Sequence, residues 1–335
     1  MNAGKTRIVV ALGGNALQSS KDGATAEAQL AVVQKTCGYL VDLIRKGYEI
    51  VIVHGNGPQV GRILLASETA KDVVPAMPFD VCGAMSQGYI GYHIQQALKQ
   101  KLKENNMDLP VATIVTQVAV DKGDTAFQNP SKPIGPFYSE EEAKKLAEEK
   151  GYTVKEDAGR GWRRVVPSPK PVDILEKDTI DSLLGRSIVI TCGGGGIPVV
   201  KKADGTYEGV AAVIDKDFAA EALAEHVNAD VLLILTEVEH VAINFGKPNQ
   251  ENLEKLTAAE ARKYMAEGQF APGSMLPKVE AAVKFVEAKP GKRAIISSLY
   301  HAVDAIEGKT GKRAIISSLY HAVDAIEGKT GTEIC

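Results

Sequence analysis

Apolar residues fall at two different spacings along the chain. Short unbroken apolar runs are typical of strands that are buried on both faces of a parallel sheet. Such runs are found in the stretches RIVVAL, YEIVIVH, VATIVTQVAV, SIVIT, DVLLIL and RAII. Between them, residues 25–46 have helical periodicity and end before Gly47, and their apolar face carries Leu30, Val33, Cys37, Leu40, Val41 and Ile44. Further helices are predicted at about 83–103 and 217–227.

This alternation of strands and helices predicts an α/β fold with a mainly parallel sheet that is covered on both sides. Residues 120–171 interrupt it with a polar stretch that contains NPSKPIGPF, a charged helix at 139–150, and EDAGRGWRRVVPSPKP. Ordinary connections between elements are far shorter than this. We interpret the segment as an inserted lid subdomain beside the main sheet, and the alternative is a mobile surface excursion.

A perfect repeat lies near the carboxyl terminus. The segment GKRAIISSLYHAVDAIEGKT occupies residues 291–310 and returns letter for letter at 311–330. Repeat architectures normally have diverged copies and at least three of them. A single perfect copy indicates a recent tandem duplication or an error of sequence assembly, and we favour the second. Both copies offer the same strand and helix to one slot in the sheet, so we expect the extra copy to be passive.

Composition excludes several classes of protein. The chain has 335 residues, is 44% hydrophobic and 24% charged, and carries a net charge of −3, which disfavours a nucleic-acid or membrane-surface partner. No apolar run approaches the roughly 20 residues of a membrane-spanning helix, and no signal-peptide pattern opens the chain. We therefore expect a cytoplasmic protein. The cysteines, which predict free thiols and no metal site, are Cys37, Cys82, Cys192 and Cys335.

Glycine-rich turns follow the predicted strands. They are Gly13-Gly14-Asn15, Gly55-Asn56-Gly57, residues 193–196, and Gly273 before a helix. Ligands of open parallel sheets bind beyond the carboxyl ends of the strands, where backbone amides and helix N-termini gather. Four such turns at one edge predict a polyanionic ligand.

Two other glycine motifs suggest different ligands. The three GKT triplets lack the upstream glycine of a P-loop. The stretch HGNGPQVG approaches a dinucleotide fingerprint, but no acidic residue follows at the distance that ribose binding requires. An oxidoreductase is therefore a less favoured alternative.

Three lysines have unusual surroundings. Lys216 lies between two carboxylates in VIDKDF, Lys278 follows APGSMLP, and Lys132 lies in NPSKPIGP. A single lysine is most often a solvated surface charge. Here each is framed by glycine, proline or carboxylates next to apolar residues, which favours a functional role. Phosphoryl transfer requires such positive charge around the transferred group.

Taken together, these stretches resemble the carbamate kinases of the amino acid kinase superfamily. The resemblance covers about the first 300 residues and rests on VVALGGNAL, VHGNGPQVG, PAMPFDVCGAMSQGYIGY, NPSKPIGPF, EDAGRGWRRVVPSPKP, CGGGGIPVV, AVIDKDFAAE, INFGKP and FAPGSMLPKVEAA. It implies a single amino acid kinase-like domain, which is a three-layer αβα sandwich with a protruding lid, and a homodimer.

The resemblance also implies an activity. The reaction would be the reversible phosphoryl transfer between ATP and carbamate, with Mg²⁺, giving ADP and carbamoyl phosphate. We expect it to make ATP in fermentative arginine breakdown.

Roles for individual residues follow from the same resemblance. The amides of Gly13, Gly14 and Asn15, with the turn of Gly55, Asn56 and Gly57, would hold the transferred phosphoryl group. The catalytic residues would be Lys132, Lys216, Asp217 and Lys278, with Asp217 holding Lys216 and Lys278 in place, and Lys132 arriving with the lid. The nucleotide would contact Thr236, Phe245, Met275 and Lys278. No general base is required, because carbamate is already an anionic nucleophile.

Two alternatives remain open at this point. A superfamily kinase that acts on an amino-acid carboxylate such as acetylglutamate is disfavoured by the KPIGPF lid and by Ala11 before the Gly-Gly turn. A non-catalytic nucleotide sensor is disfavoured by the presence of all three lysines and Asp217.

The passive role of the extra copy can be tested by deletion. Removing residues 311–330 is expected to leave the melting temperature and the activity nearly unchanged, because one copy of the strand and helix remains for the sheet. Thermal unfolding of the shortened chain checks this, and a deletion that unfolds the protein would contradict it.

Overall fold

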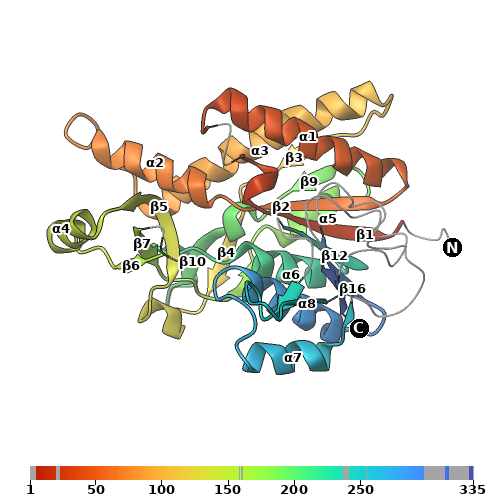
Figure 1. Cartoon of the computed structure of the whole chain (residues 1–335). Coiled ribbons are helices and arrows are strands. Elements are labelled where there is room, and N and C mark those ends of the chain that lie inside the picture. Colours follow the sequence, from red (N-terminus) through yellow and green to blue (C-terminus); the bar gives the residue numbers. More distant parts are fainter. Residues whose placement is uncertain are drawn as a thin grey trace.

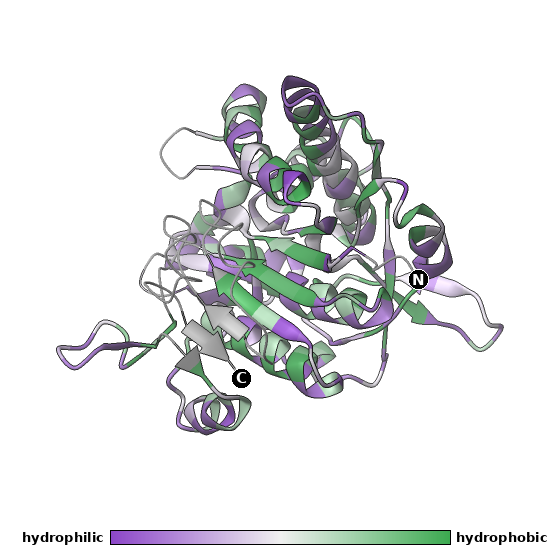
Figure 2. Ribbon diagram, turned by 90° about the vertical axis from the view of Figure 1, so that its right-hand side faces the viewer, coloured by the Kyte–Doolittle hydropathy of each residue, from purple (hydrophilic) through white to green (hydrophobic). Residues whose placement is uncertain are grey.

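The apolar runs form a central sheet in the computed structural model, which describes residues 5–19, 23–157, 159, 161–236, 241–253, 255–297, 314–316 and 332–334. Neighbouring strands pair in parallel in the order β16-β12-β1-β2-β9-β3. Their bounds are β1 Arg7–Leu12, β2 Glu49–His54, β3 Val111–Thr113, β9 Ile188–Ile190, β12 Val231–Leu235 and β16 Arg293–Ser297. Figure 2 shows these apolar strands running through the middle of the molecule.

Helices cover both faces of this sheet (Figure 1). Alternate side chains of β1 point to opposite sides, so Ile8, Val10 and Leu12 pack with α1 and α3, while Val9 and Ala11 pack with α6 and α8. The helices are α1 Ala26–Arg45, α2 Gly57–Thr69, α3 Phe79–Glu104, α4 Glu140–Lys150, α5 Lys177–Leu183, α6 Lys216–His226, α7 Ala258–Ala266 and α8 Met275–Ala288. The predicted α/β fold with a mainly parallel sheet is confirmed.

The run VATIVTQVAV was expected to be one strand, and the structure divides it. Its first part is β3 of the central sheet, and its second part is β4 (Gln117–Val120) of another sheet with the order β11-β10-β4-β8. The side chain of Gln87 on α3 binds both backbone groups of Thr116, at 2.7 and 3.1 Å, so the chain turns out of the first sheet there. The other strands of the second sheet are β8 Pro171–Ile174, β10 Ile197–Lys201 and β11 Tyr207–Gly209.

Residues 120–171 also form a small antiparallel sheet, which with α4 extends away from the central sheet next to α2 (Figure 1). Its order is β5-β7-β6, with the bounds β5 Lys132–Tyr138, β6 Val154–Glu156 and β7 Trp162–Val166. A Cβ atom on Gly61 of α2 would lie 2.4 Å from Cα of Gly135 on β5, so the two backbones are in direct contact. At the far end of α2, Glu68 binds the ammonium group of Lys150 at 2.9 Å.

The repeat contributes two described segments near the carboxyl terminus. The strand β16, from the first copy, pairs with β12, while Ala314–Ile316 of the second copy form β17 and pair antiparallel with β18 (Thr332–Ile334). β18 also pairs with β16 and with β15 (Lys255–Leu256), and β13 (Val241–Ile243) pairs with β14 (Glu251–Leu253). The first copy therefore occupies the slot beside β12. The predicted helices of both copies, and Cys335, lie outside the described residues.

Candidate active site

Three glycine turns meet where β1, β2 and β9 end. The turn after β1 lies against β12, because a Cβ atom on Gly13 would be only 2.9 Å from the carbonyl oxygen of Leu235. The backbone amide of Gly55 donates to the carbonyl of Leu12 at 3.0 Å, which links the turns after β1 and β2. After β9, a Cβ atom on Gly194 would lie 2.2 Å from Nδ2 of Asn56. These glycines therefore allow the turns to pack on one another as well as to bend.

Asp217 lies between two lysines at this edge. Its Oδ1 accepts from Nζ of Lys216 at 2.5 Å, and its Oδ2 accepts from Nζ of Lys278 at 2.9 Å. Lys216 and Asp217 begin α6, whereas Lys278 lies in the first turn of α8. The carboxylate is only 1% exposed, so its charge depends on these two partners.

The charges of this cluster depend on one another. Burial alone would raise the pKa of Asp217, but the ammonium groups of Lys216 and Lys278 outweigh it and hold that pKa below its ordinary value. Burial lowers the pKa of Lys216, and Asp217 opposes this change, whereas Lys278 adds to it. The carboxylate therefore favours the charged form of a buried ammonium group that lies next to a second one.

Asp215 connects the small sheet to the cluster. Its Oδ2 accepts from Nζ of Lys132 at 2.5 Å, and its Oδ1 caps α6 by accepting from the backbone amide of Asp217 at 2.9 Å. The sequence shows Asp215 as one of the two carboxylates around Lys216, but no role was predicted for it. Its position immediately before a helix was the signal that could have identified it.

A cavity of about 140 Å³ lies among these groups. Two of the surrounding helices, α2 and α8, begin without a side-chain cap. In α2 the amide of Gly57 is available to an anion, whereas Pro58 has no N–H, and in α8 the amide of Leu276 donates to the carbonyl of Ala271 at 3.1 Å. The lining residues are Gly55, Asn56, Gly57, Val60, Lys132, Pro133, Ile134, Gly194, Val213, Ile214, Asp215, Lys216, Asp217, Gly273 and Lys278.

Some of the sequence-predicted site residues lie outside this lining. Gly13, Gly14 and Asn15 stand beside it at the end of β1. Thr236 follows β12, and Met275 is the first residue of α8. The remaining nucleotide candidate, Phe245, is 66% exposed after β13. The structure thus gathers the four proposed catalytic residues at one cavity, and of the proposed nucleotide contacts only Lys278 lines it.

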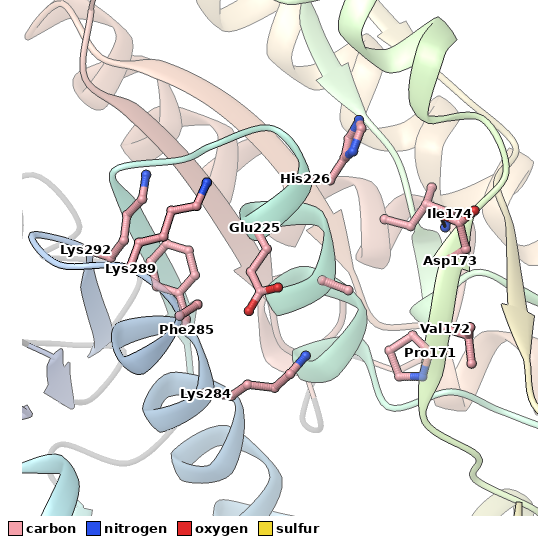
Figure 3. A pocket seen from close by; sticks show the side chains of 12 residues that line it. Pro171, Val172, Asp173, Ile174, Glu225, His226, Lys284, Phe285, Lys289 and Lys292 are labelled. Atoms are coloured by element: carbon pink, nitrogen blue, oxygen red, sulfur yellow. Dashed lines mark hydrogen bonds between the residues drawn. The ribbon is translucent and has the colours of Figure 1, made fainter.

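A larger cavity of about 420 Å³ lies at the opposite ends of α6 and α8 from the lysine cluster (Figure 3). Titratable side chains around it bind one another: Lys284 binds Glu221 at 2.6 Å, and His226 binds Asp181 at 3.1 Å. None of the predicted site residues lies in its wall. The bond between Lys284 and Glu221 joins α8 to α6. The smaller cavity is the candidate active site, because the predicted catalytic residues line it.

Other kinds of site were also sought in the described part of the chain. It contains no group of three or more His, Cys, Asp or Glu side chains that could hold a metal ion. No helix among those residues is long and apolar enough to cross a membrane. Cys37, Cys82 and Cys192 are buried free thiols, as predicted.

Comparisons with known proteins identify the family. The model of the amino acid kinase family matches residues 6–297. The chain belongs to the amino acid kinase family. Within this family, it is 58% identical to a carbamate kinase of Clostridium perfringens over 297 residues, which cover 88% of this chain and 94% of that one. A carbamate kinase of Pyrococcus furiosus is 54% identical over 296 residues, with the same coverage. The predicted resemblance to carbamate kinases is confirmed.

Solved structures of other proteins have the same fold. The carbamate kinase from Giardia lamblia bound to AMP-PNP matches with a TM-score of 0.84 and 43% identity, over 98% of both chains. An N-acetylglutamate synthase from Neisseria gonorrhoeae, at 15% identity and a TM-score of 0.54, shares the fold alone and covers 98% of this chain and 59% of that one.

The carboxyl group of Glu221 predicts a pH-dependent stability. Burial and the neighbouring Glu225 raise its pKa to about 8, although Lys284 opposes this. Since the folded chain holds this proton more tightly, the stabilisation is complete below pH 4.5 and is lost as the pH rises toward 8. Relative to Glu221→Gln, the wild type should lose up to about 1.4 kcal/mol of unfolding free energy per pH unit in that window. Denaturant unfolding at several pH values measures this, and parallel profiles would contradict it.

Proposed function

We propose that this protein is a carbamate kinase, which transfers a phosphoryl group reversibly between ATP and carbamate. The observation that carries the proposal is the buried Asp217 between Lys216 and Lys278, at the edge where the glycine turns meet. The identity to carbamate kinases supports it across most of the chain.

The proposed reaction is a direct displacement at phosphorus. A carbamate oxygen attacks the γ-phosphorus of ATP, a new P–O bond forms, and the bond to the bridging oxygen breaks. That oxygen leaves with the electron pair as part of ADP. Negative charge is spread over the transferred group during this step. Lys216 and Lys278 would stabilise it from fixed positions, and no side chain needs to remove a proton.

Backbone amides would position the transferred group. The proposed contacts are the amides of Gly13, Gly14 and Asn15 and those of the Gly55-Asn56-Gly57 turn. Support comes from the uncapped N-terminus of α2, which starts at Gly57 and lines the cavity. Such oriented amides favour a negative charge without having to reorganise during the reaction.

The small sheet would act as a lid. Lys132 on β5 reaches the cavity from this sheet and binds Asp215 in the described conformation. With substrate bound, we expect Lys132 to exchange this partner for the anionic carbamate. A lid that brings its own charge would also exclude water from the phosphoryl group.

The nucleotide would lie over the ends of β12 and α8, near Thr236, Phe245 and Met275, with Lys278 at its phosphates. Each oxygen of Asp215 and Asp217 already accepts a hydrogen bond from a lysine or a backbone amide. A Mg²⁺ ion that is held by the nucleotide phosphates, and not by these carboxylates, therefore fits the residues present. When bound, the ion would neutralise charge on the phosphate oxygens.

A homodimer and a metabolic role complete the proposal. The exposed face of α3 carries Val81, Met85 and Tyr92, an apolar stripe at helical spacing beside the edge strand β3. Such a stripe suits contact with a second copy of the chain, and the particle mass in solution decides this.

The resemblance to carbamate kinases supports ATP synthesis in fermentative arginine breakdown, in the cytoplasm.

The direct test is ATP formation from ADP, carbamoyl phosphate and Mg²⁺ in a coupled assay. The wild type should produce ATP, and Lys278→Ala should lower turnover by about 100-fold or more, because a preorganised charge is lost. Lys289→Ala, which removes the same charge just beyond the other end of α8, is the matched control and should retain normal turnover. Absence of ATP from the folded wild type, or normal turnover in Lys278→Ala, would contradict the proposal.

A further inference from the structure

The side chain of Asn56 is oriented in an unusual way for its position. Asn56 is the N-cap residue of α2, where an asparagine normally accepts from the first backbone amides of the helix. Here its side chain caps nothing and turns toward α3, where Nδ2 donates to Oγ of Ser86 at 2.8 Å. The residue is only 8% exposed and lines the cavity of the candidate site.

Ser86 fixes which end of this amide faces α3. The Ser86 hydroxyl is fully buried and donates its single hydrogen to the carbonyl of Gly83 at 2.6 Å. Its oxygen can therefore only accept from Asn56, which requires the NH₂ end of the amide at that side. The carbonyl end, Oδ1, accepts no hydrogen bond from the described residues, and it is not among their fully buried unpaired atoms.

Gly194 provides the space for this arrangement. A Cβ atom there would lie 2.2 Å from Nδ2 and 2.6 Å from Oδ1 of Asn56, so the amide packs directly on the backbone of the turn after β9. Gly194 also lines the cavity. The amide is thus held between α3 and this turn, and it belongs to a lining residue whose acceptor has no partner among the described residues.

The other polar side chains of the cavity have no comparable acceptor. Lys132, Lys216 and Lys278 only donate. Each oxygen of Asp215 and Asp217 already accepts from a lysine or a backbone amide. A substrate that carries both an anionic group and an N–H donor therefore finds many donors for its anionic end and one open side-chain acceptor for its N–H group.

We propose that Oδ1 of Asn56 accepts a hydrogen bond from the amino group of the substrate, and that Ser86 is the positioning residue that holds this acceptor in place. The inference rests on the proposed function, since carbamate and carbamoyl phosphate carry such an NH₂ group. Acetyl phosphate has nearly the same shape but a methyl group in its place. Because acetyl phosphate would leave the acceptor of such a site without a hydrogen bond, the site discriminates strongly against it. Asn56 would therefore set the preference for a carbamoyl over an acetyl group.

The test compares the two acyl phosphates as phosphoryl donors to ADP. The readout is the ratio of kcat/KM for carbamoyl phosphate to kcat/KM for acetyl phosphate. Where turnover of acetyl phosphate is too slow to follow, its inhibition constant Ki, measured against carbamoyl phosphate, replaces its kcat/KM. Asn56→Ala should lower this preference about tenfold, the loss expected for one hydrogen bond. Ser86→Ala should lower it severalfold, because the amide can then rotate.

Two further variants distinguish loss of the hydrogen bond that Oδ1 accepts from the substrate from a general disturbance of the glycine turns. Asn15→Ala makes the same change at the neighbouring turn and should leave the preference within about twofold of the wild type, even if both rates fall. Asn56→Asp keeps an acceptor and should retain the preference, although its charge slows both donors.

An unchanged preference in folded Asn56→Ala and Ser86→Ala would overturn the inference while leaving the function intact. Loss of the preference in Asn56→Asp would do the same, because it would indicate that Nδ2, and not Oδ1, faces the substrate. If the wild type made no ATP from carbamoyl phosphate, the proposed function itself would fail, which is a distinct result.

Discussion

The rest of the site depends on a single buried carboxylate that binds two ammonium groups. Without Asp217, burial would favour the neutral form of Lys216, and the nearby ammonium group of Lys278 would favour that form further. The ion pairs with Asp217 oppose both effects and fix the two lysines at the first turns of two different helices. The positive charge that phosphoryl transfer requires is therefore present before any substrate binds, at the cost of burying an ionic cluster.

The fold supplies this arrangement through its parallel sheet. Because β1, β2, β9 and β12 run in the same direction, their carboxyl ends meet, and the following turns and helices converge on one small cavity. Glycine permits that convergence, as at Gly13 and Gly194, where any side chain would collide with a neighbouring turn or strand. The chemistry is then divided between backbone amides and a few lysines, which suits a reaction that needs positioning more than proton transfer.

Local patterns predicted much of this structure, and long-range contacts determined the rest. The helix expected at 25–46 is present as α1, capped by Thr25 as its sequence indicates. The division of VATIVTQVAV could not be predicted, because it depends on Gln87, which lies on another helix. In the site, carboxylates and Gly/Pro framing identified the lysines from sequence. No local signal marked Ser86, since its link to the cavity is a hydrogen bond from Asn56, the N-cap residue of a different helix.

The most direct test of this account is the pH dependence of turnover in Asp217→Asn, which keeps the shape of the side chain but removes its charge. If Asp217 holds Lys216 protonated, the variant should lose activity at a distinctly lower pH than the wild type as the solution becomes alkaline, because the buried lysine then releases its proton more readily. If both proteins lost activity at the same alkaline pH, the result would contradict the central claim that this carboxylate maintains the charge of the site.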